Sequence, residues 1–126
     1  MRVDTRDALT GLVVESAIRV HRLLGPGLLE SVYQSALEHE LRIRRVPFRS
    51  GCELPVFYDG VELEQHFRLD FVIRDEIVVE IKSVQKLHPV HLAQLMTYLR
   101  LSGKTKGLLI NFNVVRLVLG VRRLSL

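Results

Sequence analysis

Three charged side chains interrupt two apolar segments of the chain. Asp70 lies within "LDFVI", and Glu80 and Lys82 lie within "IVVEIKSV". A charge buried in an apolar strand is costly unless a partner compensates it. Side chains two residues apart on a strand point to the same face, so we expect Glu80 and Lys82 to project together.

The length of the connection between these segments decides where Asp70 points. If residues 74–76 form a three-residue turn, Ile73 pairs with Ile77 and Asp70 lies opposite Glu80. A two-residue turn would shift the register by one position and direct Asp70 to the other face. The spacing therefore permits a cluster of two carboxylates and one ammonium group.

Such a cluster suits the metal-dependent hydrolysis of a phosphodiester bond. Two carboxylates about 5 Å apart repel each other unless a cation lies between them. A hard ion such as Mg²⁺ or Mn²⁺ binds few protein carboxylates and takes water and phosphate oxygens as its other ligands. A lysine beside the ion can position the attacking water or stabilise the charge that develops on the phosphate. The alternative is an exposed sheet face whose charges are simply solvated.

The composition is that of one globular domain over residues 1–126, with 48% apolar and 25% charged residues. Its apolar segments are shorter than the roughly 18 residues of a membrane span. The polar N-terminus does not resemble a secretory signal. Cys52 is the single cysteine, which excludes an internal disulfide and favours a cytoplasmic location.

Charge is distributed unevenly along the chain. Residues 1–80 hold ten basic and fourteen acidic residues, whereas residues 81–126 hold eight basic residues and no acidic one. An acid-free segment of this length predicts a positive surface that faces phosphates, with a solvated rim as the alternative. The residues expected to contact nucleic acid are Lys86, Arg100, Lys104, Lys106, Arg116, Arg122 and Arg123.

Apolar periodicity predicts three helices. The first spans 4–24, with Asp4 or Thr5 as its N-cap, and ends at the "GPG" motif. The second spans 28–45, and the third spans 89–102 with a proline in its first turn. The residues expected to point inward from the first two helices are Leu9, Leu12, Val13, Ala17, Val20, Leu24, Val32, Ala36, Leu37 and Leu41.

The remaining segments predict a mixed sheet. An Asp59-Gly60 turn joins the first two strands, the second strand continues through "HFRLDFVI", and "IVVEIKSV" forms the third. The helix over 89–102 is long enough to cross over to a parallel strand at 106–111. The segments "GLLINFN" and "VRLVLGVRRL" complete the sheet as one or two strands. We therefore predict an α/β fold, a mixed sheet flanked by helices in α-α-β-β-β-α-β order.

Two further stretches carry polar residues that could join the charged cluster. "GLLESVY" places Glu30 in the first turn of a helix, and a simpler explanation is that Glu30 complements the helix dipole. "HPVHLAQLMTYLRLSG" places Gln94 and Tyr98 on one helical face. An ordinary amphipathic helix with a polar edge would explain the second pattern equally well.

With these stretches included, the sequence resembles the GxxExxY proteins, a group within the PD-(D/E)XK nuclease superfamily. Gly27, Glu30 and Tyr33 match the motif that names the group. The resemblance extends through "PVHLAQLMTYLRLSG" and "GLLINFNV". It implies a restriction-endonuclease-like core, in agreement with the predicted order of elements.

The resemblance also implies roles for individual residues. Asp70 takes the place of the superfamily's first strand acid, where Leu69 replaces the preceding proline. Glu80 and Lys82 take the places of the E-x-K element, and Glu30 that of an additional acid on a helix. The implied metal ligands are Asp70, Glu80, the carbonyl of Ile81 and Glu30, and Gln94 with Tyr98 match a Q-x-x-x-Y element of related nucleases.

These patterns favour a Mg²⁺- or Mn²⁺-dependent nuclease that acts on DNA. The alternative is a non-catalytic nucleic-acid-binding or accessory subunit that retains the nuclease fold, and a third option is a protein that only interacts with other proteins. Metal-dependent cleavage separates the first hypothesis from the others. Salt-sensitive DNA binding separates the second from the third. A homodimer is compatible with so small a domain.

Overall fold

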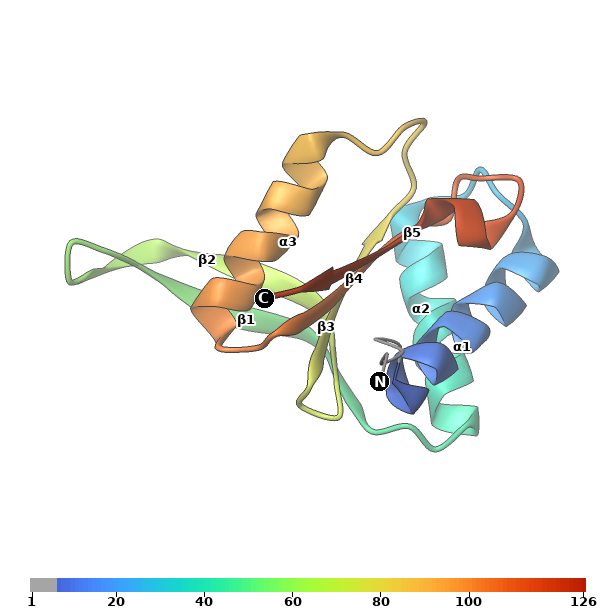
Figure 1. The fold of residues 1–126 in the computed structure, drawn as a ribbon, viewed down its shortest axis with the longest axis horizontal. Helices are drawn as coiled ribbons and strands as arrows, with labels where there is room; N and C mark the ends of the chain where they lie inside the picture. Colours follow the sequence, from blue (N-terminus) through green and yellow to red (C-terminus); the bar gives the residue numbers. More distant parts are fainter. Residues whose placement is uncertain (1–6) are drawn as a thin grey trace, which may run out of the picture.

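In the computed structural model, which describes residues 7–126, helices lie on both faces of a mixed five-stranded sheet (Figure 1). The predicted order of elements is confirmed, and a further strand follows at the C-terminal end. The elements are α1 (Ala8–Leu24), α2 (Glu30–Ile43), β1 (Phe48–Tyr58), β2 (Val61–Ile73), β3 (Ile77–Lys82), α3 (Pro89–Ser102), β4 (Lys106–Asn111), the 3₁₀ turn η1 (Leu117–Gly120) and β5 (Val121–Ser125).

The strands lie in the order β1-β2-β3-β4-β5. β3 and β4 run parallel, and the other neighbouring pairs are antiparallel. α3 makes the crossover between the parallel strands β3 and β4, as predicted from its length. No helix within residues 7–126 combines the length and the apolarity needed to cross a bilayer.

Apolar layers cover both faces of the sheet. Val79 and Ile81 of β3 belong to the layer that packs against α1 and α2, whereas Val78 belongs to the layer that packs against α3. Because successive side chains of a strand alternate between faces, Glu80 and Lys82 share the face of Val78. The two charges therefore point to the α3 side of the sheet.

The start of the first helix differs from the prediction. Asp4 and Thr5, which were predicted as its N-cap, lie outside the described residues. α1 begins after Asp7, whose carboxylate accepts a hydrogen bond from the N–H of Thr10 at 2.7 Å. Aspartate is a preferred N-cap because it satisfies an N–H group that has no partner within the helix.

Two predicted core positions are wrong. Leu24 and Val32 were expected to point inward, but they are 41% and 40% exposed. Leu24 is the last residue of α1 and Val32 lies in the first turn of α2, so both stand at helix ends beside the connection between the two helices (Figure 1). The second helix is also shorter than the predicted span of 28–45, because Leu29 is its N-cap and Arg45 has a positive φ of 58°.

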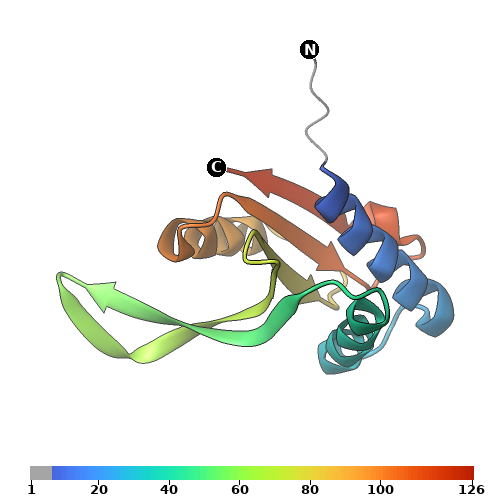
Figure 2. The same ribbon diagram turned by 90° about the horizontal axis from the view of Figure 1, so that it is seen from below.

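β1 and β2 form a long hairpin that projects from the rest of the molecule (Figures 1 and 2). Asp59 and Gly60 make its turn with φ angles of 53° and 80°, which confirms the predicted connection. β2 pairs with β3 only through its last residues, from Phe71 to Ile73. Asp70 therefore lies where the hairpin leaves the central part of the sheet.

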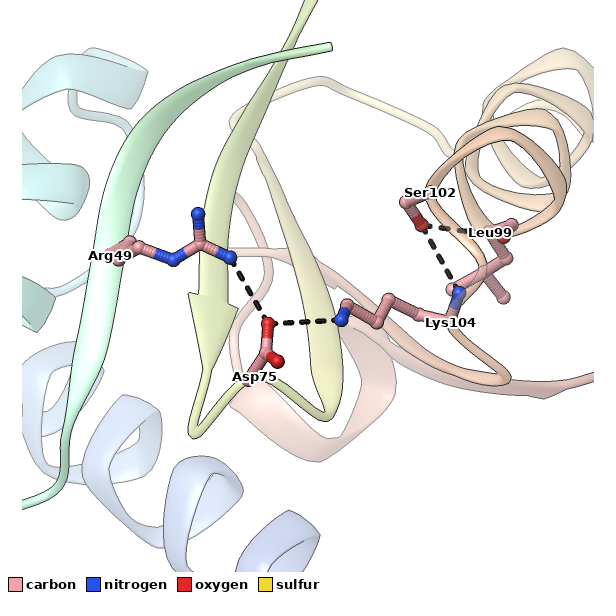
Figure 3. A network of polar contacts seen from close by, with 5 residues as sticks. All are labelled: Arg49, Asp75, Leu99, Ser102 and Lys104. Carbon is pink, nitrogen blue, oxygen red and sulfur yellow. Dashed lines mark hydrogen bonds and ion pairs between the residues drawn. The ribbon is translucent and has the colours of Figure 1, made fainter.

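A three-residue turn joins β2 to β3, as the first of the two predicted registers requires. Ile73 pairs with Ile77 across this turn. The carboxylate of Asp75 in the turn accepts hydrogen bonds from Arg49 of β1 at 3.2 Å and from Lys104 at 2.9 Å (Figure 3). These two contacts connect the turn to its neighbours on both sides.

The segment "VRLVLGVRRL" is divided between η1 and β5. β5 pairs with β4 and forms one edge of the sheet. A Cβ on Gly120 would lie 2.1 Å from the carbonyl oxygen of Asn111. Glycine is required at this close approach of two backbones, which interrupts the strand pattern.

Candidate active site

The backbones of β2 and β3 separate next to the paired residues Phe71 and Val79, and two carboxylates occupy the opening. The carboxylate of Glu80 accepts a hydrogen bond from the N–H of Asp70 at 3.3 Å. The carboxylate of Asp70 accepts one from the N–H of Ile81 at 2.8 Å. The two acids therefore lie side by side on neighbouring antiparallel strands, and the predicted register is confirmed.

Glu80 is 5% exposed, which makes it a buried acid next to another acid. Burial and, second to it, the negative charge of Asp70 raise the pKa of Glu80 to about 9. The positive charge of Lys82 opposes this shift but is the weaker effect. A divalent cation between the carboxylates would remove the cost of ionising both, so this donor set fits a hard ion such as Mg²⁺.

The carbonyl of Ile81 is directed toward the same opening. The next carbonyl along β3, that of Lys82, accepts a hydrogen bond from the N–H of Phe112 after β4 at 2.9 Å. Because consecutive carbonyls of a strand point to opposite sides, the carbonyl of Ile81 points away from β4 and toward β2. An oxygen ligand from Ile81 is thus available beside Asp70.

Glu30 approaches this opening from the first turn of α2. Its carboxylate accepts a hydrogen bond from the N–H of Ser83, the residue after β3, at 3.4 Å. Within residues 7–126, no three His, Cys, Asp or Glu side chains are close enough to hold one ion together. Glu30 therefore borders the acid pair without completing a three-carboxylate site.

Tyr33 of the "GLLESVY" stretch has a structural position. Its ring is fully buried and stacks on Phe112, with ring centroids 4.4 Å apart. Its hydroxyl donates to the carbonyl of Gly25 at 2.6 Å and accepts from the N–H of Leu28 at 3.2 Å. These contacts fix the connection between α1 and α2 and hence the start of the helix that carries Glu30.

Lys82 is half-buried at the end of β3. Desolvation and then the positive charge of Lys82 lower the pKa of His91, which lies in the first turn of α3. Among the described residues, no carboxylate lies within ion-pair distance of the Lys82 ammonium. Lys82 lies on the sheet face that α3 covers, two residues after Glu80.

The two polar residues predicted on the third helix have different surroundings. Tyr98 is buried, and burial followed by the charges of Glu80 and Asp70 raises its pKa. Its ring packs in the apolar layer with Leu69 and Val78, on the sheet face toward which Glu80 points. Gln94 lies one turn earlier, is exposed, and makes no side-chain hydrogen bond with another residue in the described part of the chain.

Two residues near the acids were missed by the sequence analysis. Gln34 of α2 donates to the backbone carbonyl of Asp70 at 3.0 Å, and Arg68 of β2 lies 3.6 Å from the carboxylate of Asp70. Gln34 is four residues after Glu30 on the helix, and Arg68 is two before Asp70 on the strand, so spacing could have found both. They line an opening of about 460 Å³ with Glu30, Ser31, Ser35, Glu38, Asp70 and Ile81.

The predicted basic residues are only partly available to a ligand. Lys104 is bound to Asp75 at 2.9 Å, and Lys106 is bound to Asp7 at 2.6 Å. The other members are exposed at the surface and comprise Lys86, Arg100, Arg116, Arg122 and Arg123.

A comparison with protein families identifies the group to which this arrangement belongs. The model of the PD-(D/E)XK nuclease superfamily matches residues 7–124. The chain belongs to the PD-(D/E)XK nuclease superfamily. Its helices and mixed sheet accordingly form an α/β restriction-endonuclease-like fold. Neither the curated proteins nor the solved structures gave a significant match.

PD-(D/E)XK nucleases generally use divalent metal ions, which agrees with the chemistry of the acid pair. In this PD-(D/E)XK protein, the acids stand on β2 and β3 and the lysine follows Glu80 by two residues. The narrower resemblance to the GxxExxY proteins stays a prediction, as do the roles of the individual residues.

Proposed function

We propose that this PD-(D/E)XK protein is a metal-dependent nuclease that hydrolyses phosphodiester bonds in DNA. The observation that carries the proposal is the pairing of Asp70 with Glu80 at the opening between β2 and β3, with Lys82 on the same face. A buried acid pair beside a lysine suits a reaction in which a cation and a phosphate enter together.

Asp70, Glu80 and the carbonyl of Ile81 would hold Mg²⁺ or Mn²⁺. Bound there, the ion would polarise the phosphoryl group and neutralise part of its charge. Glu30 accepts a hydrogen bond from the segment after β3 and would reach the ion through a water molecule. All these ligand atoms are oxygens, the type that hard divalent ions prefer.

Lys82 would act directly on the reacting phosphate. Its ammonium can orient the attacking water and stabilise the negative charge that grows in the transition state. Tyr98 would position the substrate or the lysine from α3, because it packs on the sheet face toward which Glu80 and Lys82 point. Gln94 is exposed one turn away and would contact the substrate outside the acid pair.

The substrate class follows from the charge of the chain. The segment 81–126 holds eight basic residues and no acidic one, a charge balance that favours a polyanion. We propose that Lys86, Arg100, Arg116, Arg122 and Arg123 contact its phosphates, with smaller contributions from the ion-paired Lys104 and Lys106.

The proposal is tested with purified protein and end-labelled single-stranded, double-stranded and branched DNA, and with RNA. Reactions contain Mg²⁺, Mn²⁺ or EDTA, and the double variant Asp70→Asn/Lys82→Met serves as the control for contaminating nucleases. We expect cleavage of DNA with Mg²⁺ or Mn²⁺ and none with EDTA or with the control. If no substrate is cut, or if the control cuts as well as the wild type, the proposal is wrong.

A non-catalytic nucleic-acid-binding or accessory subunit is the second candidate, and the acid-free basic segment favours it independently of the acid pair. In that case DNA should bind without being cleaved. Affinity should fall steeply between about 50 and 200 mM salt, because each neutralised phosphate releases condensed counterion. The combined change Arg122→Gln and Arg123→Gln should flatten this dependence. Binding that ignores salt would exclude this second candidate.

A further inference from the structure

We infer that Arg68 binds a phosphate group of the substrate next to the Asp70–Glu80 pair, a role that rests on the proposed nuclease function and assigns one more residue to it. Arg68 lies outside the segment whose charge suggested nucleic-acid binding. Its assignment depends on three independent observations, namely its position, its packing and its exposure.

The position of Arg68 directs its side chain to the site. It precedes Asp70 by two residues on β2, so the two side chains share one face of the strand. Nη1 of Arg68 lies 3.6 Å from Oδ1 of Asp70. Arg68 also lines the opening that contains Asp70 and Ile81. Arg68 supplies a positive charge on β2, the strand of Asp70, and Lys82 supplies one on β3, the strand of Glu80.

The guanidinium of Arg68 lies against Gly51 of β1. Ser50 and Cys52 pair with Phe71 and Leu69, so Gly51 is the β1 residue opposite Asp70. A Cβ on Gly51 would lie 2.8 Å from Nη2 of Arg68, closer than side chains tolerate, and Gly51 also has a φ of +62°. The backbone of β1 therefore offers the guanidinium a place that only glycine leaves open.

The exposure of Arg68 indicates what the side chain is for. Its side chain is 63% exposed, and an ion pair this exposed contributes little to the stability of the fold. A guanidinium that remains this exposed can still donate two parallel hydrogen bonds to a phosphate. When Asp70 binds a cation, the guanidinium can turn to a phosphate oxygen that enters with the substrate.

The test measures the affinity of Arg68→Ala for DNA and, separately, its affinity for Mg²⁺. We expect the first to fall and the second to rise. With Mg²⁺ present, and with Lys82→Met in both proteins to suppress cleavage, DNA affinity should fall about tenfold or more, because a charge-assisted contact is lost. The slope of log affinity against log salt should become shallower by about 0.9. Without DNA, Mg²⁺ binding should tighten about two- to tenfold, because a positive charge next to Asp70 is removed. A general structural defect would weaken both DNA binding and Mg²⁺ binding.

The matched control is Arg49→Ala. Arg49 lies on β1, is 64% exposed and pairs with Asp75 in the β2–β3 turn, so its removal deletes the same charge from an equally exposed arginine outside the site (Figure 3). It should leave the Mg²⁺ affinity unchanged. Arg68→Lys keeps the charge without the planar fork, so it should preserve the Mg²⁺ affinity of the wild type and restore only part of the DNA affinity.

Gly51→Ala provides a further check, because it displaces the guanidinium without deleting it and should weaken DNA binding in the same direction as Arg68→Ala. If the wild type cleaves DNA but Arg68→Ala binds DNA and Mg²⁺ as Arg49→Ala does, the role of Arg68 is wrong and the nuclease proposal stands. A wild type that neither binds nor cleaves nucleic acid overturns both.

Discussion

The side chain of Glu80 accepts a hydrogen bond from the backbone N–H of Asp70 at a position where a regular antiparallel pair would use a backbone carbonyl. The side chain of Asp70 accepts one from the N–H of Ile81 in the same way. The two acids thus satisfy backbone donors that the separation of the strands would otherwise leave without partners. The same carboxylate oxygens therefore bond the strand backbones and are proposed to bind the metal ion.

Lys82→Met should separate chemistry from binding. The change removes the ammonium and keeps most of the apolar stem, so packing at the end of β3 should survive. Cleavage should fall about 100-fold or more, the usual scale for one lost group that stabilises transition-state charge. Binding of Mg²⁺ and of DNA should persist in calorimetric and fluorescence titrations. A variant with the cleavage rate of the wild type would exclude Lys82 from the reaction.

Asp70→Asn should abolish cleavage by a different route. The amide oxygen can still accept from the N–H of Ile81, so the opening between β2 and β3 should keep its shape. The loss of a negative ligand should weaken Mg²⁺ binding by roughly tenfold or more, since ligand charge sets the affinity of oxygen sites. Asp75→Asn, in the exposed turn, is the control. Equal Mg²⁺ affinities for the two variants would contradict the metal site.

The buried Glu80 should make the stability of the metal-free protein depend on pH. Its pKa rises from 4.5 to about 9 in the folded state, so between these values the folded state holds a proton that the unfolded state has lost. The free energy of unfolding should therefore fall as pH rises through this window. Urea unfolding in EDTA from pH 5 to 9 measures the slope. Glu80→Gln should remove most of it, and an unchanged slope would refute the assignment.

The same proton should couple metal binding to pH. Below about 9, an ion that binds both carboxylates must displace the proton from Glu80. The affinity for Mg²⁺ should therefore rise with pH between 6 and 8, by up to about tenfold per unit. Calorimetry in two buffers of different ionisation enthalpy should detect about one released proton per ion at neutral pH. An affinity that is constant over this range would place the ion elsewhere.

Tyr33→Phe should reveal a structural role for the tyrosine of "GLLESVY". The change removes the hydroxyl that bonds Gly25 and Leu28 and leaves the ring stacked on Phe112. The free energy of unfolding should drop by about 1–3 kcal/mol, because buried polar partners lose their hydrogen bond. Tyr58→Phe, at the exposed end of the hairpin, is the control in urea unfolding. Similar stability for both variants would contradict this role.

The sequence predicted the parts of the fold that local chemistry determines. The third helix runs from Pro89 to Ser102, as its proline and the following glycine indicate, and Gly103 adopts a left-handed φ of 75°. The pairing of Ile73 with Ile77 was one of two alternatives, and the alternation of side chains then placed Asp70 beside Glu80. Once the turn length is known, the spacing along the two strands is enough to place Asp70 beside Glu80.

Tertiary packing decided what the sequence left undetermined. The periodicity of α1 and α2 placed Leu24 and Val32 inside, but the packing at these helix ends leaves both side chains exposed. Spacing within α2 places Gln34 on the same face as Glu30, but its contact with Asp70 depends also on how α2 lies over the opening. The packing of Arg68 on Gly51 likewise depends on the register between β1 and β2.

The three-residue turn after β2 has a consequence for how this chain tolerates insertions and deletions. Both faces of β2 and β3 are apolar next to the turn, from Phe71 to Ile73 and from Ile77 to Val79, so a pairing shifted by one residue would still bury apolar side chains. Hydrophobicity alone therefore does not select the register that unites Asp70 with Glu80. The register is selected by the number of residues in the turn and by the contacts of Asp75 with Arg49 and Lys104. Loss of one turn residue could leave a folded protein whose two acids no longer meet.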